Sequence, residues 1–129
     1  MSPRTIALLL AAAVGACAPA AGTGRAVPDR DVVGADELAA TRAPDLLTAL
    51  RQVRPEFLQP RGVSSIHNAT PDYPAIYLDG VQIGGVDQLG NISTVNVREV
   101  RRLSAAQALT RTGTATPGGA ILIFTKKGG

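Results

Sequence analysis

The chain has 129 residues, the length of one small domain. Thirteen Lys and Arg against ten Asp and Glu give a formal net charge of +3, an excess too small to indicate a nucleic-acid binder. One cysteine excludes an internal disulfide, and one cysteine with one histidine cannot supply the four ligands of a structural zinc site. We therefore expect no bound metal, no cofactor and no nucleic-acid partner.

The first residues have the pattern of a targeting segment. Arg4 precedes an apolar run over residues 6–14, which is too short to cross a bilayer core of about 30 Å but has the length of a signal-peptide apolar region. The small residues Gly15 and Ala16 then lead to Cys17, the only cysteine. The alternative is an ordinary secretory peptide in which this cysteine has no role.

The tetrapeptide Val14-Gly15-Ala16-Cys17 resembles the lipobox of bacterial lipoproteins. The resemblance implies that residues 1–16 are a lipoprotein signal peptide and that Cys17 is the lipidation site. It also implies that two acyl chains on the thiol, usually joined by a third such as palmitate on the freed amine, anchor the mature chain. No acidic residue follows the cysteine directly, so by resemblance we expect the outer membrane.

Three segments are predicted before the middle of the chain. Residues 17–31 are rich in alanine, glycine and proline and predict a flexible tether with a reach of roughly 20 Å. The folded domain is expected over residues 32–129, beginning with a short strand at Val32 and Val33. Asp36 is expected to cap a brief helix over residues 37–41.

A second helix is predicted after Pro44, a residue suited to a first helical turn. Apolar residues 46, 47, 50 and 53 fall on one helical face, and Pro55 is expected to end the helix. Residues 60–74 are expected to form a loop with one strand at residues 63–66.

The clearest local signal in the chain lies at residues 75–83. Two apolar strands are joined there by Asp79-Gly80, whose tolerance of positive φ fits a tight hairpin turn. Period-two alternation places Val81 and Ile83 on the same side of the second strand. The later elements are expected at residues 87–92 (a helical turn), 99–103 (a strand), 105–111 (a helix) and 120–125 (a buried strand).

Taken in order, residues 36–58, 74–85, 92–109 and 118–128 resemble the plug domain of TonB-dependent outer-membrane receptors, particularly the SusC-like transporters. The hairpin with its Asp-Gly turn and the final Gly-Gly-Ala-Ile-Leu-Ile-Phe-Thr-Lys-Lys-Gly are the most specific parts. The resemblance implies a small α+β fold, with a mixed sheet of about four strands and short helices.

Several positions depart from the plug pattern. Thr112 stands where the family commonly has tyrosine, Arg102 occupies a strand position that is usually apolar, and residues 64–68 replace an arginine-glycine segment. No energy-coupling box is evident near the amino end. Because a barrel needs well over 200 residues and the sequence ends at Gly129, we expect a stand-alone plug-like lipoprotein without the barrel.

Candidate chemistry is sparse in this sequence. His67 with Ser65 or Asp72 is the one arrangement suggestive of a general base, but all three fall in one polar loop without a positioned nucleophile, so we expect no enzyme. A second hypothesis is a basic stripe on neighbouring strands; the alternative is scattered solvated charge relieved by Glu99. The stripe would comprise Arg98, Arg101, Arg102, Lys126 and Lys127.

Three function classes follow. The favoured one is a non-catalytic protein-interaction or accessory module, anchored at Cys17 and pairing with an envelope protein or receptor along the edge of the final strand. The first alternative is a stand-alone binder of carbohydrate or metal chelate linked to outer-membrane uptake, for which the loop over residues 61–73 is the feature to test. A remote alternative is a hydrolase.

Overall fold

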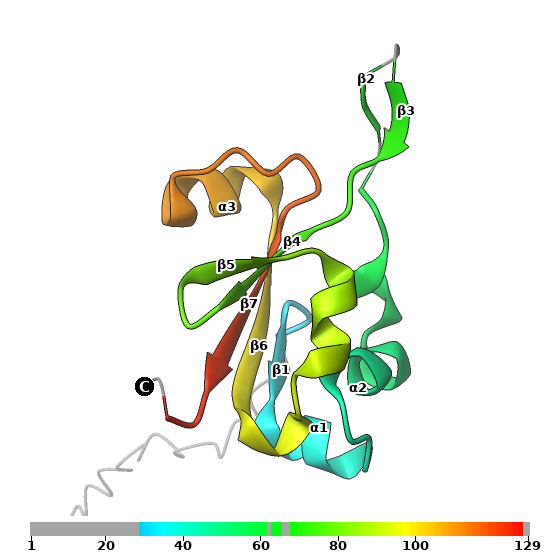
Figure 1. The fold of residues 1–129 in the computed structure, drawn as a ribbon, viewed down its shortest axis with the longest axis vertical. Coiled ribbons are helices and arrows are strands. Elements are labelled where there is room, and N and C mark those ends of the chain that lie inside the picture. The colour runs from blue at the N-terminus through cyan, green and yellow to red at the C-terminus, as the bar shows by residue number, and fades with distance from the viewer. Residues whose placement is uncertain (1–28, 62, 66–67, 128–129) are drawn as a thin grey trace, which may run out of the picture.

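A computed structural model describes residues 29–61, 63–65 and 68–127 of the chain (Figure 1). The candidate lipidation site Cys17, its signal peptide and most of the expected tether lie outside these residues. Within the described ranges, no helix is long and apolar enough to cross a membrane.

The architecture is α+β, as expected, with one mixed sheet of five strands. In spatial order these are β1 (Val32–Gly34), β6 (Val97–Leu103), β7 (Ala120–Thr125), β4 (Ala75–Leu78) and β5 (Val81–Gly84). Strands β4 and β7 run parallel, and the other neighbours are antiparallel. The sheet has five strands rather than about four because the short strand β1 pairs with β6.

The position of the final strand corrects one expectation. β7 lies at the centre of the sheet, hydrogen-bonded to β6 on one side and to β4 on the other, so it has no free edge for a partner. The edges belong to β1 and β5. The prediction was wrong because the parallel pairing of β4 with β7 joins segments that are far apart in the chain, and no local pattern encodes it.

The helices follow from local signals with small shifts. α2 (Leu46–Val53) is capped by Asp45, whose carboxylate accepts a hydrogen bond from the Thr48 N–H at 2.8 Å. α1 (Ala35–Ala40) starts directly after β1, with Gly34 as its N-cap, so the predicted cap at Asp36 was wrong. The remaining helices are η1 (Pro55–Leu58), η2 (Val86–Asn91), η3 (Thr94–Asn96) and α3 (Ala105–Thr112).

The segment expected to be mainly loop contains a two-stranded ribbon. β2 (Val63–Ser65) pairs antiparallel with β3 (Asn68–Pro71), and the ribbon extends away from the main sheet (Figure 1). The strand expected at residues 63–66 is confirmed over Val63–Ser65 as β2, and Ile66 lies outside the described residues. β3 was missed because its sequence, Asn-Ala-Thr-Pro, lacks the apolar alternation that predicts a strand.

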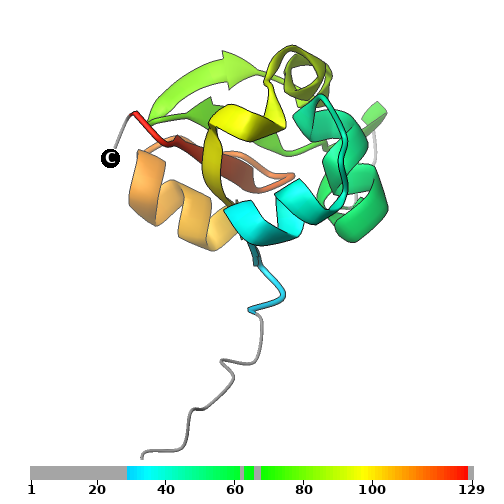
Figure 2. The same ribbon diagram turned by 90° about the horizontal axis from the view of Figure 1, so that it is seen from below.

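The two faces of the main sheet are covered differently. α1 and α2 lie on one side and α3 lies on the other (Figure 2). The larger core, between the sheet and α1, α2, η1 and η2, contains thirteen buried residues, among them Phe57, Leu50 and Ile123. The smaller cluster under α3 has five: Tyr77, Leu103, Ala108, Ala120 and Leu122.

Two adjacent glycines allow the chain to enter β7. A Cβ on Gly118 would stand 2.4 Å from the backbone oxygens of Asp72 and Tyr73, and one on Gly119 would stand 2.4 Å from that of Leu103. Gly119 also has φ of +80°, a conformation that L residues rarely adopt. The pair is therefore required by the close approach of β7 to the segment before β4 and to the end of β6.

Candidate functional site

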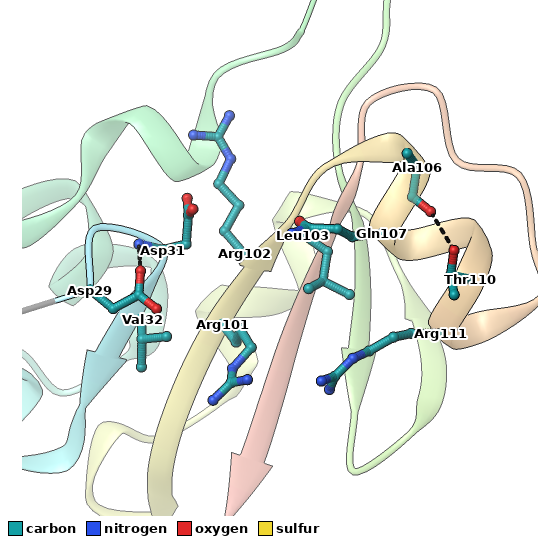
Figure 3. A pocket seen from close by; sticks show the side chains of 10 residues that line it. All are labelled: Asp29, Asp31, Val32, Arg101, Arg102, Leu103, Ala106, Gln107, Thr110 and Arg111. Atoms are coloured by element: carbon teal, nitrogen blue, oxygen red, sulfur yellow. Dashed lines mark hydrogen bonds between the residues drawn. The ribbon is translucent and has the colours of Figure 1, made fainter.

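A groove of about 420 Å³ lies between β6 and α3 (Figure 3). Its walls come from three elements: the start of β1, the end of β6 and the outer turns of α3. The lining residues are Asp29, Asp31, Val32, Arg101, Arg102, Leu103, Ala106, Gln107, Thr110 and Arg111. Cations and carboxylates thus meet at one place on the surface.

The ends of α3 fix one wall of this groove. Ser104 and Gln107 form a capping box, in which the Ser104 Oγ accepts from the Gln107 N–H at 3.3 Å and the Ser104 N–H donates to the Gln107 side chain at 2.9 Å. The helix ends at Gly113, in the left-handed conformation with φ of +72°. These two caps hold Arg111, in the last turn, where its guanidinium points into the groove (Figure 3).

The arginines of β6 point to different surroundings. Arg101 enters the groove and donates to the Glu99 carboxylate at 2.9 Å. Arg102 extends in another direction (Figure 3), with its guanidinium over the ring of Phe57 at 5.7 Å. Burial lowers the pKa of Arg102, and the charge of Arg61 adds to this effect.

The expected basic stripe is therefore divided. β6 and β7 are neighbours, as the stripe requires, but Arg98 lies over Phe124 at 6.0 Å whereas Arg102 lies over Phe57. Those two rings pack in different clusters on opposite faces of the sheet. The division follows from a bulge between Val97 and Glu99. The bulge interrupts the alternation of side chains between the two faces of β6, so Arg98 and Arg102 point to opposite faces of the sheet.

A second hollow, of about 320 Å³, lies where α3 leaves the sheet uncovered. It is lined by Tyr77, Gly80, Arg111, Thr112, Leu122 and Phe124. The Tyr77 hydroxyl faces the Gln82 side-chain oxygen at 3.4 Å, a long hydrogen bond at the rim of this surface. The hollow was not predicted from the sequence, because it forms only when β4 and β7 pair in parallel. Tyr77 and Phe124, two of the few aromatic residues in the chain, both line it.

The turn beside this hollow has the predicted geometry. Asp79 has φ of +47° and Gly80 has φ of +89°, as a two-residue hairpin turn requires. The Asp79 carboxylate accepts from the Thr125 N–H at 2.9 Å and from the Thr125 hydroxyl at 2.7 Å. These hydrogen bonds from Thr125 hold the pKa of Asp79 below its ordinary value of 3.8 and tie the hairpin tip to the end of β7.

The other predicted site residues do not assemble into a catalytic centre in the described part of the chain. His67 lies outside the described residues, and Ser65 is the last residue of β2. Asp72 is half-buried, and its backbone oxygen accepts from the Arg61 N–H at 3.1 Å. Across residues 29–61, 63–65 and 68–127, no three His, Cys, Asp or Glu side chains come together as metal ligands.

Comparison with known proteins gives matches among solved structures only. No protein-family model matches the chain, and no curated protein matches it significantly. The ferric enterobactin receptor PfeA of Pseudomonas aeruginosa is similar with a TM-score of 0.48 and 20% identity, over 74% of this chain and 17% of the receptor. The siderophore receptor PirA of Pseudomonas aeruginosa gives 0.41 and 22%, over 74% of this chain and 18% of the receptor.

The ferric-catecholate import receptor Fiu of E. coli K12 is similar with a TM-score of 0.43 and 22% identity, over 74% of this chain and 14% of the receptor. The chain therefore spans less than a fifth of the length of the receptors to which it is similar. These are receptors of the class named by the sequence resemblance.

Proposed function

We propose that this chain is a non-catalytic interaction module of the cell envelope, anchored in the outer membrane through lipid at Cys17 and accessory to uptake. The observation that carries the proposal is the unequal cover of the main sheet. One face is closed by α1, α2, η1 and η2, whereas the other carries α3 alone and keeps a hollow beside it. An aromatic and cationic surface left open in this way is suited to a protein partner.

The chemistry of the open face indicates the kind of partner. Phe124 is half-buried beneath the exposed Arg98, and exposed Arg111 stands at the rim of the hollow. Aromatic residues and arginine are the types enriched where protein surfaces meet. We therefore expect a partner that presents an apolar or aromatic group with a neighbouring carboxylate.

A charge-reversal experiment tests this surface. Arg98→Glu with Arg111→Glu places two carboxylates on the open face, and crosslinking in native envelopes should give partner bands that weaken at least severalfold. Arg42→Glu with Arg51→Glu is the matched control, because these exposed arginines belong to the covered side near α1 and α2. Equal bands for both double variants would exclude the open face as the contact surface.

The anchor is tested separately. The wild-type protein should enter the detergent phase on phase partitioning, and Cys17→Ala should move it to the aqueous phase because the acylated thiol is lost. A wild-type protein that is already aqueous would rule out lipidation. Residues 25–129 serve as the unanchored form, since the core residues of the described chain all lie between Val33 and Ile123.

The groove between β6 and α3 favours a second candidate, binding of a small ligand. Arg101 and Arg111 enter a space of about 420 Å³ together with the polar side chains of Gln107 and Thr110. Arg101 already donates to Glu99, so a carboxylate of an anionic metal chelate is expected to pair with the guanidinium of Arg111, a contact that a neutral sugar cannot make as strongly. Calorimetric titration of residues 25–129 with ferric citrate tests it, and heat that Arg111→Gln does not reduce would exclude the groove.

A further inference from the structure

We infer that β5 is a self-association edge, along which two copies of this chain pair antiparallel about a two-fold axis at Gln82. The inference rests on the proposed function, since it names one surface and one partner of the same interaction module. In the main sheet β5 is a terminal strand, with β4 on one side only.

The backbone of β5 directs its polar groups outward at Gln82. The Ala75 N–H at the start of β4 donates to the Gly119 oxygen, and the Asp79 N–H just after β4 donates to the Ile123 oxygen. In the regular parallel ladder of β4 with β7, every second residue of β4 therefore bonds towards β7. Tyr77 lies between these two, and its antiparallel partner is Gln82. Tyr77 and Gln82 are thus a non-hydrogen-bonded pair, and the N–H and C=O of Gln82 point to the open side of the sheet.

The side chains along this edge do not protect it. No charged residue occurs between Gly80 and Val86, and Val81 is 66% exposed. Natural sheet edges are commonly blocked by lysine, by proline, by an inward-pointing charge or by a β-bulge. Of these, β5 has only a register shift after the Tyr77–Gln82 pair, where Ile83 is an extra residue, and this shift leaves the outward N–H and C=O of Gln82 in place. The other terminal strand, β1, is only three residues long, follows the charged Asp29-Arg30-Asp31 and runs directly into α1. β5 is therefore the edge that accepts a further strand.

The strand that fits this edge is β5 itself. When two copies pair about Gln82, Val81 of one copy lies opposite Ile83 of the other, which gives two apolar cross-strand pairs on one face. The two Gln82 residues form the central hydrogen-bonded pair. Because this stretch carries no charge, no like charges oppose each other across the axis.

The size of the contact sets its strength. Two four-residue strands bury far less surface than the roughly 1,200 Å² of a stable protein interface. Association should therefore be weak in dilute solution and should increase on a membrane, where anchoring raises the effective concentration towards the order of 1 mM. An assay that captures a short-lived pair is required.

Disulfide trapping supplies this assay, because residues 25–129 contain no cysteine of their own. A hydrogen-bonded antiparallel pair brings two Cα atoms to about 5.5 Å, within the range that a disulfide bridges. Gln82→Cys should form covalent dimers under mild oxidation at least about tenfold faster than Gln52→Cys, which places the same thiol on the exposed side of α2. Equal rates would overturn the inference.

The register is tested by mixing two variants. Val81→Cys and Ile83→Cys should form mixed disulfide dimers faster than either forms dimers alone. Adding Gln82→Pro to both should abolish the trapping, because it removes the central outward N–H, while Gln82→Thr should preserve it. Thermal melting should show both backgrounds folded, since that N–H makes no bond to β4. Dimers of Val81→Cys alone at the rate of the mixture would contradict this register.

Disulfide trapping and crosslinking in native envelopes distinguish the self-association edge from the proposed function. Gln82→Cys trapped on a different protein, with no covalent dimer, would overturn the second copy as the occupant of β5. Partner bands that persist while Gln82→Cys forms no dimer would overturn the self-association edge and leave the proposed function intact. Efficient dimer trapping without any other partner band would instead count against the accessory role.

Discussion

The two faces of the central strand β7 differ in how completely their side chains are buried. Ile121 and Ile123 point to the face covered by α1 and α2 and are completely buried. Phe124, the next residue, points to the α3 face and is only half-buried, although it is the larger side chain. One strand thus carries a closed face and an open face, so we expect stability to depend mainly on the closed side, whereas the proposed function places binding on the open side.

The largest expected loss of stability comes from a substitution in the closed face. Ile123→Ala should lower the free energy of unfolding by about 2–5 kcal/mol, because it leaves a cavity where β7 meets the main core. Urea denaturation of residues 25–129 measures the change.

Phe124→Ala is the neighbouring control on the open face. It removes a larger side chain but should cost less than Ile123→Ala, because solvent already reaches the ring. A larger loss for Phe124→Ala would show that the α3 face, and not the helical face, carries the stability of the domain.

The second prediction concerns Gly119, the residue directly before β7. Gly119→Ala should destabilise by roughly 2 kcal/mol or more, since its Cβ would collide with the Leu103 carbonyl in addition to the strain of a positive φ. Gly80→Ala is the matched control, with φ of +89° but no atom within 4 Å of the added Cβ. Melting midpoints should rank Gly119→Ala well below Gly80→Ala, and equal midpoints would mean that the backbone adjusts freely.

The features predicted well from the sequence depend on neighbouring residues. The hairpin expected at residues 75–83, which the structure extends to Gly84, was predicted because Asp79-Gly80 encodes its own turn and apolar residues alternate along each strand. The second helix was predicted for the same reason, although Asp45 rather than Pro44 defines its start. Such elements need no knowledge of the rest of the fold.

The features that failed depend on contacts between distant segments. The central place of β7 is set by its parallel pairing with β4, and the division of Arg98 from Arg102 is set by the bulge in β6. The sequence carries one signal for that bulge: the apolar residues Val97 and Val100 are three positions apart, which does not fit the period of two in a regular strand. In the structure both are buried in the larger core. The groove and the hollow both required these contacts, so the sequence could not reveal them.

The third prediction uses pH to compare the two sides. Hydrogen bonds from Thr48 hold the pKa of Asp45 below its ordinary 3.8 at the start of α2, as those from Thr125 do for Asp79 at the open side. A lowered pKa in the folded state means that the unfolded chain takes up the proton first. The stability from each carboxylate is thus present above about pH 4 and is lost as the pH falls through the lower folded pKa.

Urea midpoints measured from about pH 6 to about pH 2 test this linkage. Asp79→Asn should reduce the acid-induced loss of stability, and Asp45→Asn should reduce it independently. Thr125→Val is the intermediate control, since it removes the hydroxyl donor to Asp79 but keeps the backbone N–H. An unchanged pH dependence in both asparagine variants would contradict the role of these hydrogen bonds.

The smallest expected effects come from the two arginines that lie over aromatic rings. Arg102 stands over the fully buried Phe57 on the closed face, whereas Arg98 is exposed above the half-buried Phe124 on the open face. Arg102→Ala should cost about 1 kcal/mol, because it removes both the cation–π contact and the apolar stem that covers Phe57. Arg98→Ala should cost about 0.5 kcal/mol or less, since water already solvates its charge.

Arg102→Met separates the two parts of that cost, because methionine keeps an apolar stem over Phe57 and removes the charge. Burial already disfavours the charged form of Arg102, so Arg102→Met should recover most of the stability lost in Arg102→Ala. High salt should diminish the effect of Arg98→Ala and leave that of Arg102→Ala nearly unchanged, because exposed charges are screened more strongly. If Arg98→Ala proves the more costly change, the open face contributes to folding as well as to binding, and a partner surface would then have to be sought elsewhere on the domain.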